Sequence, residues 1–162
     1  MKETIKNLTA YQAELPVDVV KAKYQLDHLA RLSANESPYG PSPKVGEAIR
    51  AIPDDVLGFY PDGQATLLRQ KVAALEQVDP EDLVFGVGAD ELIQLLTRTV
   101  LTPGGNMVVP SPTFGEYALH AQIEQATTKQ VPVDEETGHV NFAGMLAAVD
   151  ERTEMVWLAN PN

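Results

Sequence analysis

The sequence predicts an α/β fold, a largely parallel sheet with helices on both faces. The first observation is an alternation, from about residue 81 onward, of short apolar segments with segments whose apolar residues recur at helical spacing. The second is that residues 83–85 and 155–158 are apolar without interruption, as is typical of strands buried on both faces. The third is the composition: 162 residues, 44% of them hydrophobic, are enough for a core and suit one domain or a domain with an arm.

The first part of the chain predicts a polar arm over residues 1–31, followed by the start of the core. Within the arm, Asp18 is a candidate N-cap for a short helix over residues 19–26. Prolines and glycines then impose extended or turn conformations on residues 34–43 and 58–63. Two further helices are predicted in this part, over residues 43–52 and 64–76.

The alternating part predicts strands that are joined by helices. The predicted strands are residues 83–87, 106–109, 128–133 and 155–159. The predicted helices are residues 89–101, 115–125 and 142–149. Because a helix lies between successive strands, the strands are expected to run parallel. The last strand leads directly into residues 160–162, so its cover must come from a partner, or the chain is the front part of a longer polypeptide, which we favour.

Charge and composition argue against several classes of protein. The net charge is −11 and no Lys/Arg-rich run occurs, so neither nucleic acid nor an anionic membrane is an expected partner. Cysteine is absent, which excludes disulfides and thiolate metal sites, and the three histidines lack metal-binding spacing. No signal peptide or membrane-spanning segment is recognisable, so a cytoplasmic location is expected.

Three places in the sequence are candidates for ligand binding. Residues 86–91 lead from a predicted strand through two glycines into a helix, where free N–H groups and the helix dipole can bind a phosphate. The alternative is that Asp90 and Glu91 satisfy their own helix N-terminus. Phe114 follows the next predicted strand and could stack on a flat heteroaromatic ring, or pack into the core. Tyr60, in a proline-containing turn, is a phenol available for hydrogen bonding.

Five motifs with a common order and spacing add a resemblance to a known family. They are residues 32–43 (LSANESPYGPSP), 60–63 (YPDG), 86–91 (GVGADE), 112–117 (PTFGEY) and 160–162 (NPN). In this order they resemble the fold-type-I, pyridoxal-phosphate-dependent aminotransferases of class I/II. The first motif combined with the third is most similar to the histidinol-phosphate aminotransferases within that group.

The resemblance implies an activity and an organisation. The activity is transfer of an amino group between histidinol phosphate and 2-oxoglutarate or glutamate, in histidine biosynthesis, with pyridoxal 5′-phosphate as cofactor. The organisation is a homodimer in which residues 32–162 form the N-terminal part of the cofactor-binding large domain, truncated at its C-terminal end. Residues 1–31 would form an N-terminal arm and a segment of the small domain.

The resemblance also implies roles for individual residues. The implied cofactor-binding residues are Gly88, Ala89, Asp90, Glu91, Phe114 and Tyr60. The implied substrate-binding residues are Tyr11, Asn35, Glu36, Tyr39 and Gly40. The backbone around Ala89 and Asp90 would bind the cofactor phosphate, Phe114 would stack on the pyridine ring, and Tyr60 would reach the phosphate of the neighbouring subunit.

No lysine of this chain stands in the sequence context of the family's Schiff-base lysine. The 162-residue chain alone is therefore expected to contain no catalytic residue and to be inactive in transamination. Two other interpretations stay open at this point. One is a non-catalytic α/β module that binds a phosphate ligand or a partner, and the other is a different aminotransferase of the same superfamily.

Overall fold

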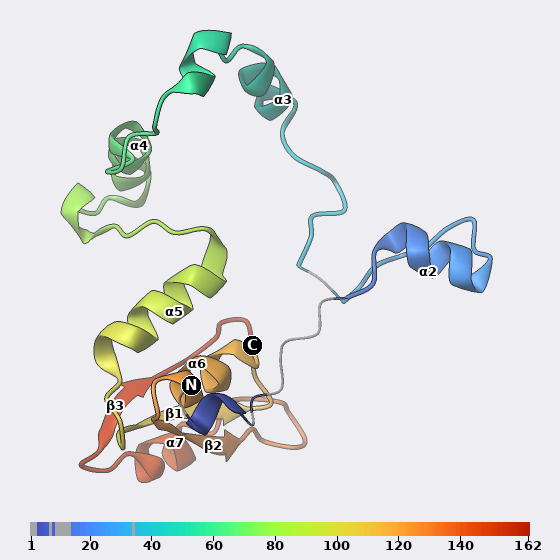
Figure 1. Cartoon of the computed structure of the whole chain (residues 1–162). Helices are drawn as coiled ribbons and strands as arrows, with labels where there is room; N and C mark the ends of the chain where they lie inside the picture. Colours follow the sequence, from blue (N-terminus) through green and yellow to red (C-terminus); the bar gives the residue numbers. More distant parts are fainter. Residues whose placement is uncertain (1–2, 7, 9–13, 34) are drawn as a thin grey trace. The chain divides into compact units, whose positions relative to one another are not determined.

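The computed structural model describes residues 3–6, 8, 14–33 and 35–162 (Figure 1). The chain forms two compact units, which are described separately. One unit is Gln12–Leu83, and the other comprises Val84–Asn162 together with the N-terminal helix α1 (Glu3–Lys6). The expected division at residue 31 into an arm and a large domain stays a prediction.

The unit that begins at Val84 contains a parallel three-stranded sheet. Its strands are β1 (Asn106–Ser111), β2 (Thr127–Pro132) and β3 (Thr153–Val156). They lie in the order β2-β1-β3, and both pairs are parallel, with Met107 beside Thr128 and Met155. The helices of this unit are α5 (Gly88–Val100), α6 (Glu116–Ile123) and α7 (Phe142–Ala148). The predicted parallel α/β fold is confirmed.

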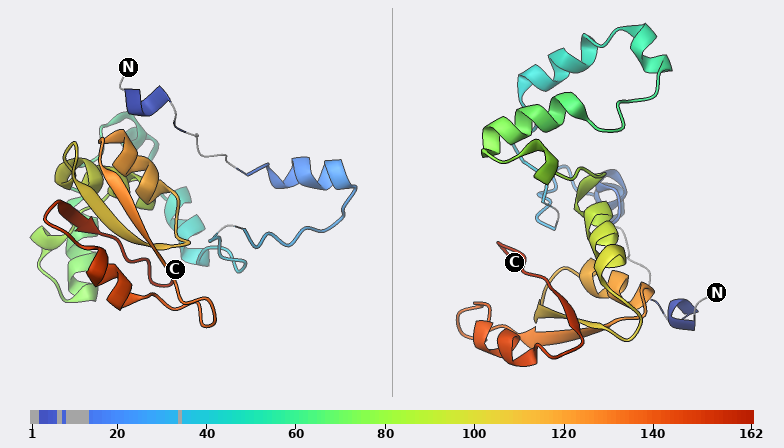
Figure 2. Two further views of the ribbon diagram at one scale, coloured as in Figure 1. Left: turned by 90° about the horizontal axis from the view of Figure 1, so that it is seen from below. Right: turned by 90° about the vertical axis from the view of Figure 1, so that its left-hand side faces the viewer.

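Alternate residues of the central strand belong to two separate cores. Because successive side chains of a strand point to opposite faces, Met107 and Val109 share one face of β1 and Val108 lies on the other. Met107 and Val109 pack with Ala121 of α6, whereas Val108 packs with Met145 of α7. All five residues are buried. Both faces of the sheet are therefore covered by helices, which Figure 2 shows from two further sides.

A polar network joins the starts of the three strands. Asn106 of β1 donates from Nδ2 to Asp150 Oδ1 (2.8 Å), and Lys129 of β2 lies with its Nζ 2.8 Å from Asp150 Oδ2. Thr153 of β3 donates from Oγ1 to Asn106 Oδ1 (2.7 Å). The Lys129 ammonium and then the Asn106 amide hold the pKa of Asp150 well below its usual value. The network links each strand to its neighbour at the end of the sheet where the strands begin.

The prediction of a strand over residues 83–87 is wrong. These residues form no strand: Leu83 is extended, whereas Val87 lies in a bend. The structure pairs β1 with only β2 and β3 among the described residues. A strand requires a partner whose backbone completes the ladder of hydrogen bonds. Without one, Val84 remains 68% exposed. The last predicted strand is also shorter, although the N–H of Trp157 still donates to Val108 O (3.0 Å).

The unit Gln12–Leu83 is built from helices and turns. Its α-helices are α2 (Val17–Tyr24), α3 (Pro43–Arg50) and α4 (Thr66–Glu76), and its 3-10 helices are η1 (Asp54–Gly58) and η2 (Pro80–Asp82). The prediction that Asp18 is the N-cap of this helix is wrong. Pro16 is the N-cap, with its φ of −54° held by the ring and its ψ of 143° outside the helical region. Asp18 lies in the first turn, where its negative charge interacts favourably with the helix dipole.

Side-chain hydrogen bonds fix the turn that precedes α4. The Asp62 carboxylate accepts from the N–H groups of Gln64 (2.9 Å) and Thr66 (2.8 Å). Hydrogen bonds from Thr66 and Gln64 hold the pKa of Asp62 below its usual value. Arg69, in α4, donates to the carbonyl of Pro80 (2.8 Å) and to that of Leu83.

Within the described ranges, no helix combines the length and apolar character needed to cross a membrane.

Candidate functional site

The start of helix α5 has the backbone geometry expected of an anion-binding loop. Helix α5 begins at Gly88, whose φ of +77° is in the left-handed region that favours glycine. The N–H of Gly88 donates to Gly86 O (3.0 Å), which closes a tight turn before the helix. The N–H groups of Ala89 and Asp90 lie in the first helical turn, where the helix itself supplies no acceptor. An anion can therefore bind here to N–H groups at the positive end of the helix dipole.

Glu91 satisfies part of this helix start, as the second interpretation of the motif proposed. Its Oε2 accepts a hydrogen bond from the N–H of Val87 at 2.5 Å. Val87 is the N-cap residue and lies outside the first turn. The carboxylate thus takes an N–H that precedes the helix, and the two interpretations of this loop are compatible.

Phe114 lies after β1 and before α6, on a platform of aromatic rings. Its ring packs edge-on against Tyr117 at a centroid distance of 5.8 Å and an interplanar angle of 87°. Tyr117 in turn stacks on Trp157, with centroids 4.8 Å apart. Phe114 is 41% exposed: one side contacts the core through Tyr117, and the rest of the ring is accessible. Its stacking on a heteroaromatic ring stays a prediction. A cavity of about 250 Å³ lies beside it, lined by Ser111, Pro112, Thr113 and Gln130 among others.

The loop that carries Phe114 is anchored by a residue distant in sequence. Asn162 Oδ1 accepts from Thr113 Oγ1 (2.6 Å), and Asn162 Nδ2 donates to Pro112 O (2.8 Å). Asn162 closes a motif in the sequence, but no pattern indicated this contact. The aromatic contacts of Tyr117 and Trp157 were likewise not predicted, because they depend on which strands become neighbours.

The remaining predicted site residues lie in the unit Gln12–Leu83. Tyr60 is fully exposed in its turn, and Tyr39 is also exposed. Gly40 has a φ of +71° and donates its N–H to Ser37 O (3.2 Å). Asn35 and Glu36 are exposed, and Glu36 Oε1 lies 3.9 Å from Arg31 Nη1. Tyr11 lies outside the described residues. The roles implied for these residues stay predictions.

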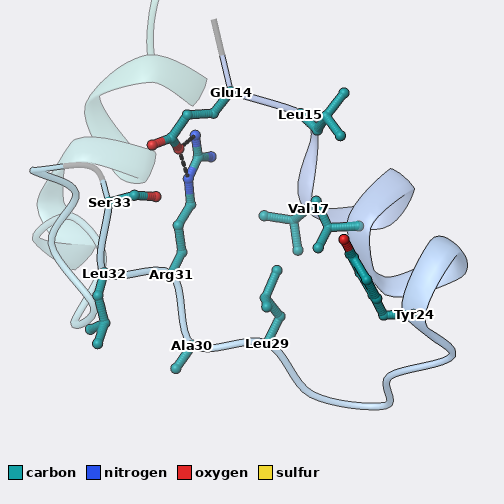
Figure 3. A pocket seen from close by; sticks show the side chains of 10 residues that line it. Glu14, Leu15, Val17, Tyr24, Leu29, Ala30, Arg31, Leu32 and Ser33 are labelled. Carbon is teal, nitrogen blue, oxygen red and sulfur yellow. Dashed lines mark hydrogen bonds and ion pairs between the residues drawn. The ribbon is translucent and has the colours of Figure 1, made fainter.

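A second pocket lies within the same unit, between α2 and the segment that follows it (Figure 3). Its volume is about 640 Å³ and its lining is mostly apolar, including Leu15, Val17 and Leu29. At one side Arg31 binds a single oxygen of Glu14 through Nε (2.9 Å) and Nη2 (2.6 Å). Hydrogen bonds from Ser33 and Arg31 hold the pKa of Glu14 below its usual value.

Within the described part of the chain, no three His, Cys, Asp or Glu side chains are grouped to hold a metal ion.

Sequence similarity decides which family the chain belongs to. The sequence pattern of the family described as aminotransferase class I and II matches residues 27–162. The chain belongs to the class I and II aminotransferases. This aminotransferase chain is 74% identical over 162 residues to a histidinol-phosphate aminotransferase from Leuconostoc citreum, and 68% identical to one from Leuconostoc mesenteroides. It is covered completely in both alignments but spans only 46% and 45% of those relatives.

Solved structures agree with the aminotransferase family. A histidinol-phosphate aminotransferase from Sinorhizobium meliloti, crystallised with pyridoxal-5′-phosphate, matches 99% of the chain with a TM-score of 0.83 and 26% identity. The chain covers 42% of that structure. An aspartate aminotransferase from Thermotoga maritima matches with a TM-score of 0.72 at 18% identity, which shows the shared fold.

Proposed function

We propose that this chain acts as the N-terminal portion of a pyridoxal-phosphate-dependent aminotransferase that transfers an amino group between histidinol phosphate and 2-oxoglutarate. The observation that carries the proposal is the 74% identity, over all 162 residues, to a relative named histidinol-phosphate aminotransferase. The substrate pair, the cofactor and a homodimeric assembly are all part of this proposal. A cytoplasmic location belongs to it as well.

The described residues fit pyridoxal phosphate. The N–H groups of Ala89 and Asp90 and the positive end of helix α5 would bind its phosphate, with the left-handed Gly88 opening the turn. Phe114 would stack on its ring, because this side chain is partly exposed and braced by Tyr117. When bound, the cofactor supplies an electron sink for the amino transfer.

The substrate and the second subunit involve the other unit. We propose that Tyr11, Asn35, Glu36, Tyr39 and Gly40 face the substrate. Tyr60 would donate a hydrogen bond from its hydroxyl to the cofactor phosphate of the neighbouring subunit. Its complete exposure within one chain is compatible with that role, because the phenol is free to enter another subunit's site.

A chimaera tests this proposal, because the chain itself lacks a lysine in the expected context. Residues 1–162 would replace the corresponding part of the Leuconostoc citreum relative, and the rate of glutamate formation from 2-oxoglutarate would be measured with histidinol phosphate as donor. We expect turnover close to that of the intact relative, and none from the 162-residue chain alone. A folded chimaera that binds the cofactor but does not use histidinol phosphate would contradict the proposal. Faster turnover with an aromatic amino acid or a different phosphorylated amine would indicate another aminotransferase.

A further inference from the structure

The loop that leads into helix α5 is closed by a side chain of the helix itself. Glu91 folds back so that its Oε2 lies 2.5 Å from the N–H of Val87. The same oxygen lies where a side chain at position 86 would be: a Cβ added to Gly86 would be 2.9 Å from Glu91 Oε2 and 3.1 Å from Leu92 Cδ2. Gly86 and Glu91 therefore interlock, since the carboxylate occupies the space that the glycine leaves open.

This interlock determines the direction of the backbone N–H groups. Val87 is held from one side by Glu91, and the N–H of Gly88 is held by Gly86 O at 3.0 Å. With both of these donors engaged, the chain enters the helix through a left-handed Gly88, and the next two N–H groups belong to the first turn of the helix. The N–H groups available to a ligand are then those of Ala89 and Asp90.

We propose that Glu91 is a positioning residue of the phosphate site, and this inference rests on the proposed function. Its carboxylate holds Val87 through a hydrogen bond and so presents Ala89 and Asp90 to the phosphate. The hydrogen bond is what matters for this role. The negative charge opposes a bound phosphate, because both anions lie near the same helix N-terminus.

The two contributions separate in a pair of substitutions. Glu91→Gln keeps an acceptor oxygen of the same reach and removes the charge, whereas Glu91→Ala removes both. We expect Glu91→Gln to bind pyridoxal phosphate as tightly as the unchanged chain or more tightly. Glu91→Ala should bind it about tenfold more weakly, the effect of losing one charge-assisted hydrogen bond.

The experiment is a titration of the full 162-residue chain with pyridoxal phosphate, and separately with pyridoxal, followed by quenching of Trp157 fluorescence. Pyridoxal lacks the phosphate, so a role at the phosphate site predicts that Glu91→Ala weakens the first ligand and leaves the second unchanged. A merely structural defect would weaken both. Glu151→Ala is the matched control, because it removes one exposed negative charge from the same unit.

Hydrogen exchange at the Val87 amide gives a readout that does not depend on a ligand. It should be accelerated in Glu91→Ala and unchanged in Glu91→Gln. If Glu91→Gln loses affinity as Glu91→Ala does, or if Glu91→Ala binds pyridoxal phosphate normally, the role of Glu91 is refuted. If the unchanged chain binds pyridoxal phosphate no more tightly than pyridoxal, the proposed phosphate site itself is contradicted. This holds whatever the hydrogen-exchange rate of the Val87 amide.

Discussion

Two neighbouring residues of helix α7 offer the sharpest test of how the sheet is covered. Met145 is 4% exposed and packs against Val108 and Val131, whereas Leu146 is 76% exposed. Both side chains extend beyond Cβ by about three methylene-sized groups, and alanine suits a helix at either position. Replacing each by alanine therefore removes similar apolar groups from the two sides of one helix. Only Met145→Ala should destabilise the protein.

The magnitude follows from burial. Removing about three groups at about 0.8 kcal/mol each lowers the free energy of unfolding by about 2.4 kcal/mol. The cavity left behind adds to this, which gives about 3 kcal/mol, inside the range of about 2–5 kcal/mol for buried methionine. Leu146→Ala should change it by less than about 0.5 kcal/mol. Met145→Leu, which conserves volume, should cost less than about 1.5 kcal/mol.

The assay is equilibrium unfolding in urea, monitored by the fluorescence of Trp157. With a slope of about 2 kcal/mol per molar urea, Met145→Ala should lower the midpoint by about 1.5 M. Leu146→Ala should leave it within about 0.3 M. Equal effects of the two substitutions, or a larger effect at Leu146, would show that α7 does not pack on β1 and β2 as described.

Three further predictions concern other contacts. Gly144→Ala in α7 should destabilise the protein although alanine favours helices, because the added Cβ would lie 2.7 Å from Asn141 Nδ2 and 2.9 Å from Val131 Cγ1. A higher unfolding midpoint in urea would refute this close approach. Lys129 and Asn106 lower the pKa of Asp150, so the ionised carboxylate stabilises the protein fully above about pH 4, and this stabilisation is lost as the pH falls toward the native pKa. In Asp150→Asn the free energy of unfolding should therefore decrease less steeply as the pH is lowered below about 4. An unchanged dependence on pH would contradict this. Asn162→Ala removes the hydrogen bonds to the loop that carries Phe114, so it should weaken pyridoxal phosphate binding several-fold with little change in the unfolding midpoint. Unchanged binding would show that these hydrogen bonds do not position Phe114 for the cofactor.

Local patterns were sufficient for most of the fold. The alternation of apolar segments predicted the parallel sheet, and β1 and β2 begin at or within one residue of the predicted positions. Proline and glycine positions predicted the turns around residues 34–43 and 58–63. The candidate phosphate loop was also recognisable, because a left-handed glycine at a helix start is a local property of the chain.

Local patterns failed where a distant partner decides the outcome. Residues 83–87 have the composition of a buried strand, but a strand also needs a neighbour, and the described part of the chain supplies none. The N-cap of α2 was misplaced by two residues for a different, local reason: the helix begins directly after Pro16, so Asp18 already lies in its first turn. The implied roles of Tyr60 and of residues 35–40 stay predictions, since they concern a substrate and a second subunit.

The sequence by itself determined the alternation of strands and helices, the family, and which segments are candidates to contact a phosphate or an aromatic ring. These are properties of residue order and local backbone preference, which act over a few positions. The tertiary structure alone decided that Asn162 holds Thr113, 49 residues earlier, and that Trp157 supports the ring of Tyr117. Such contacts form only when the sheet brings distant segments together, because no short-range preference specifies which side chains will meet across it.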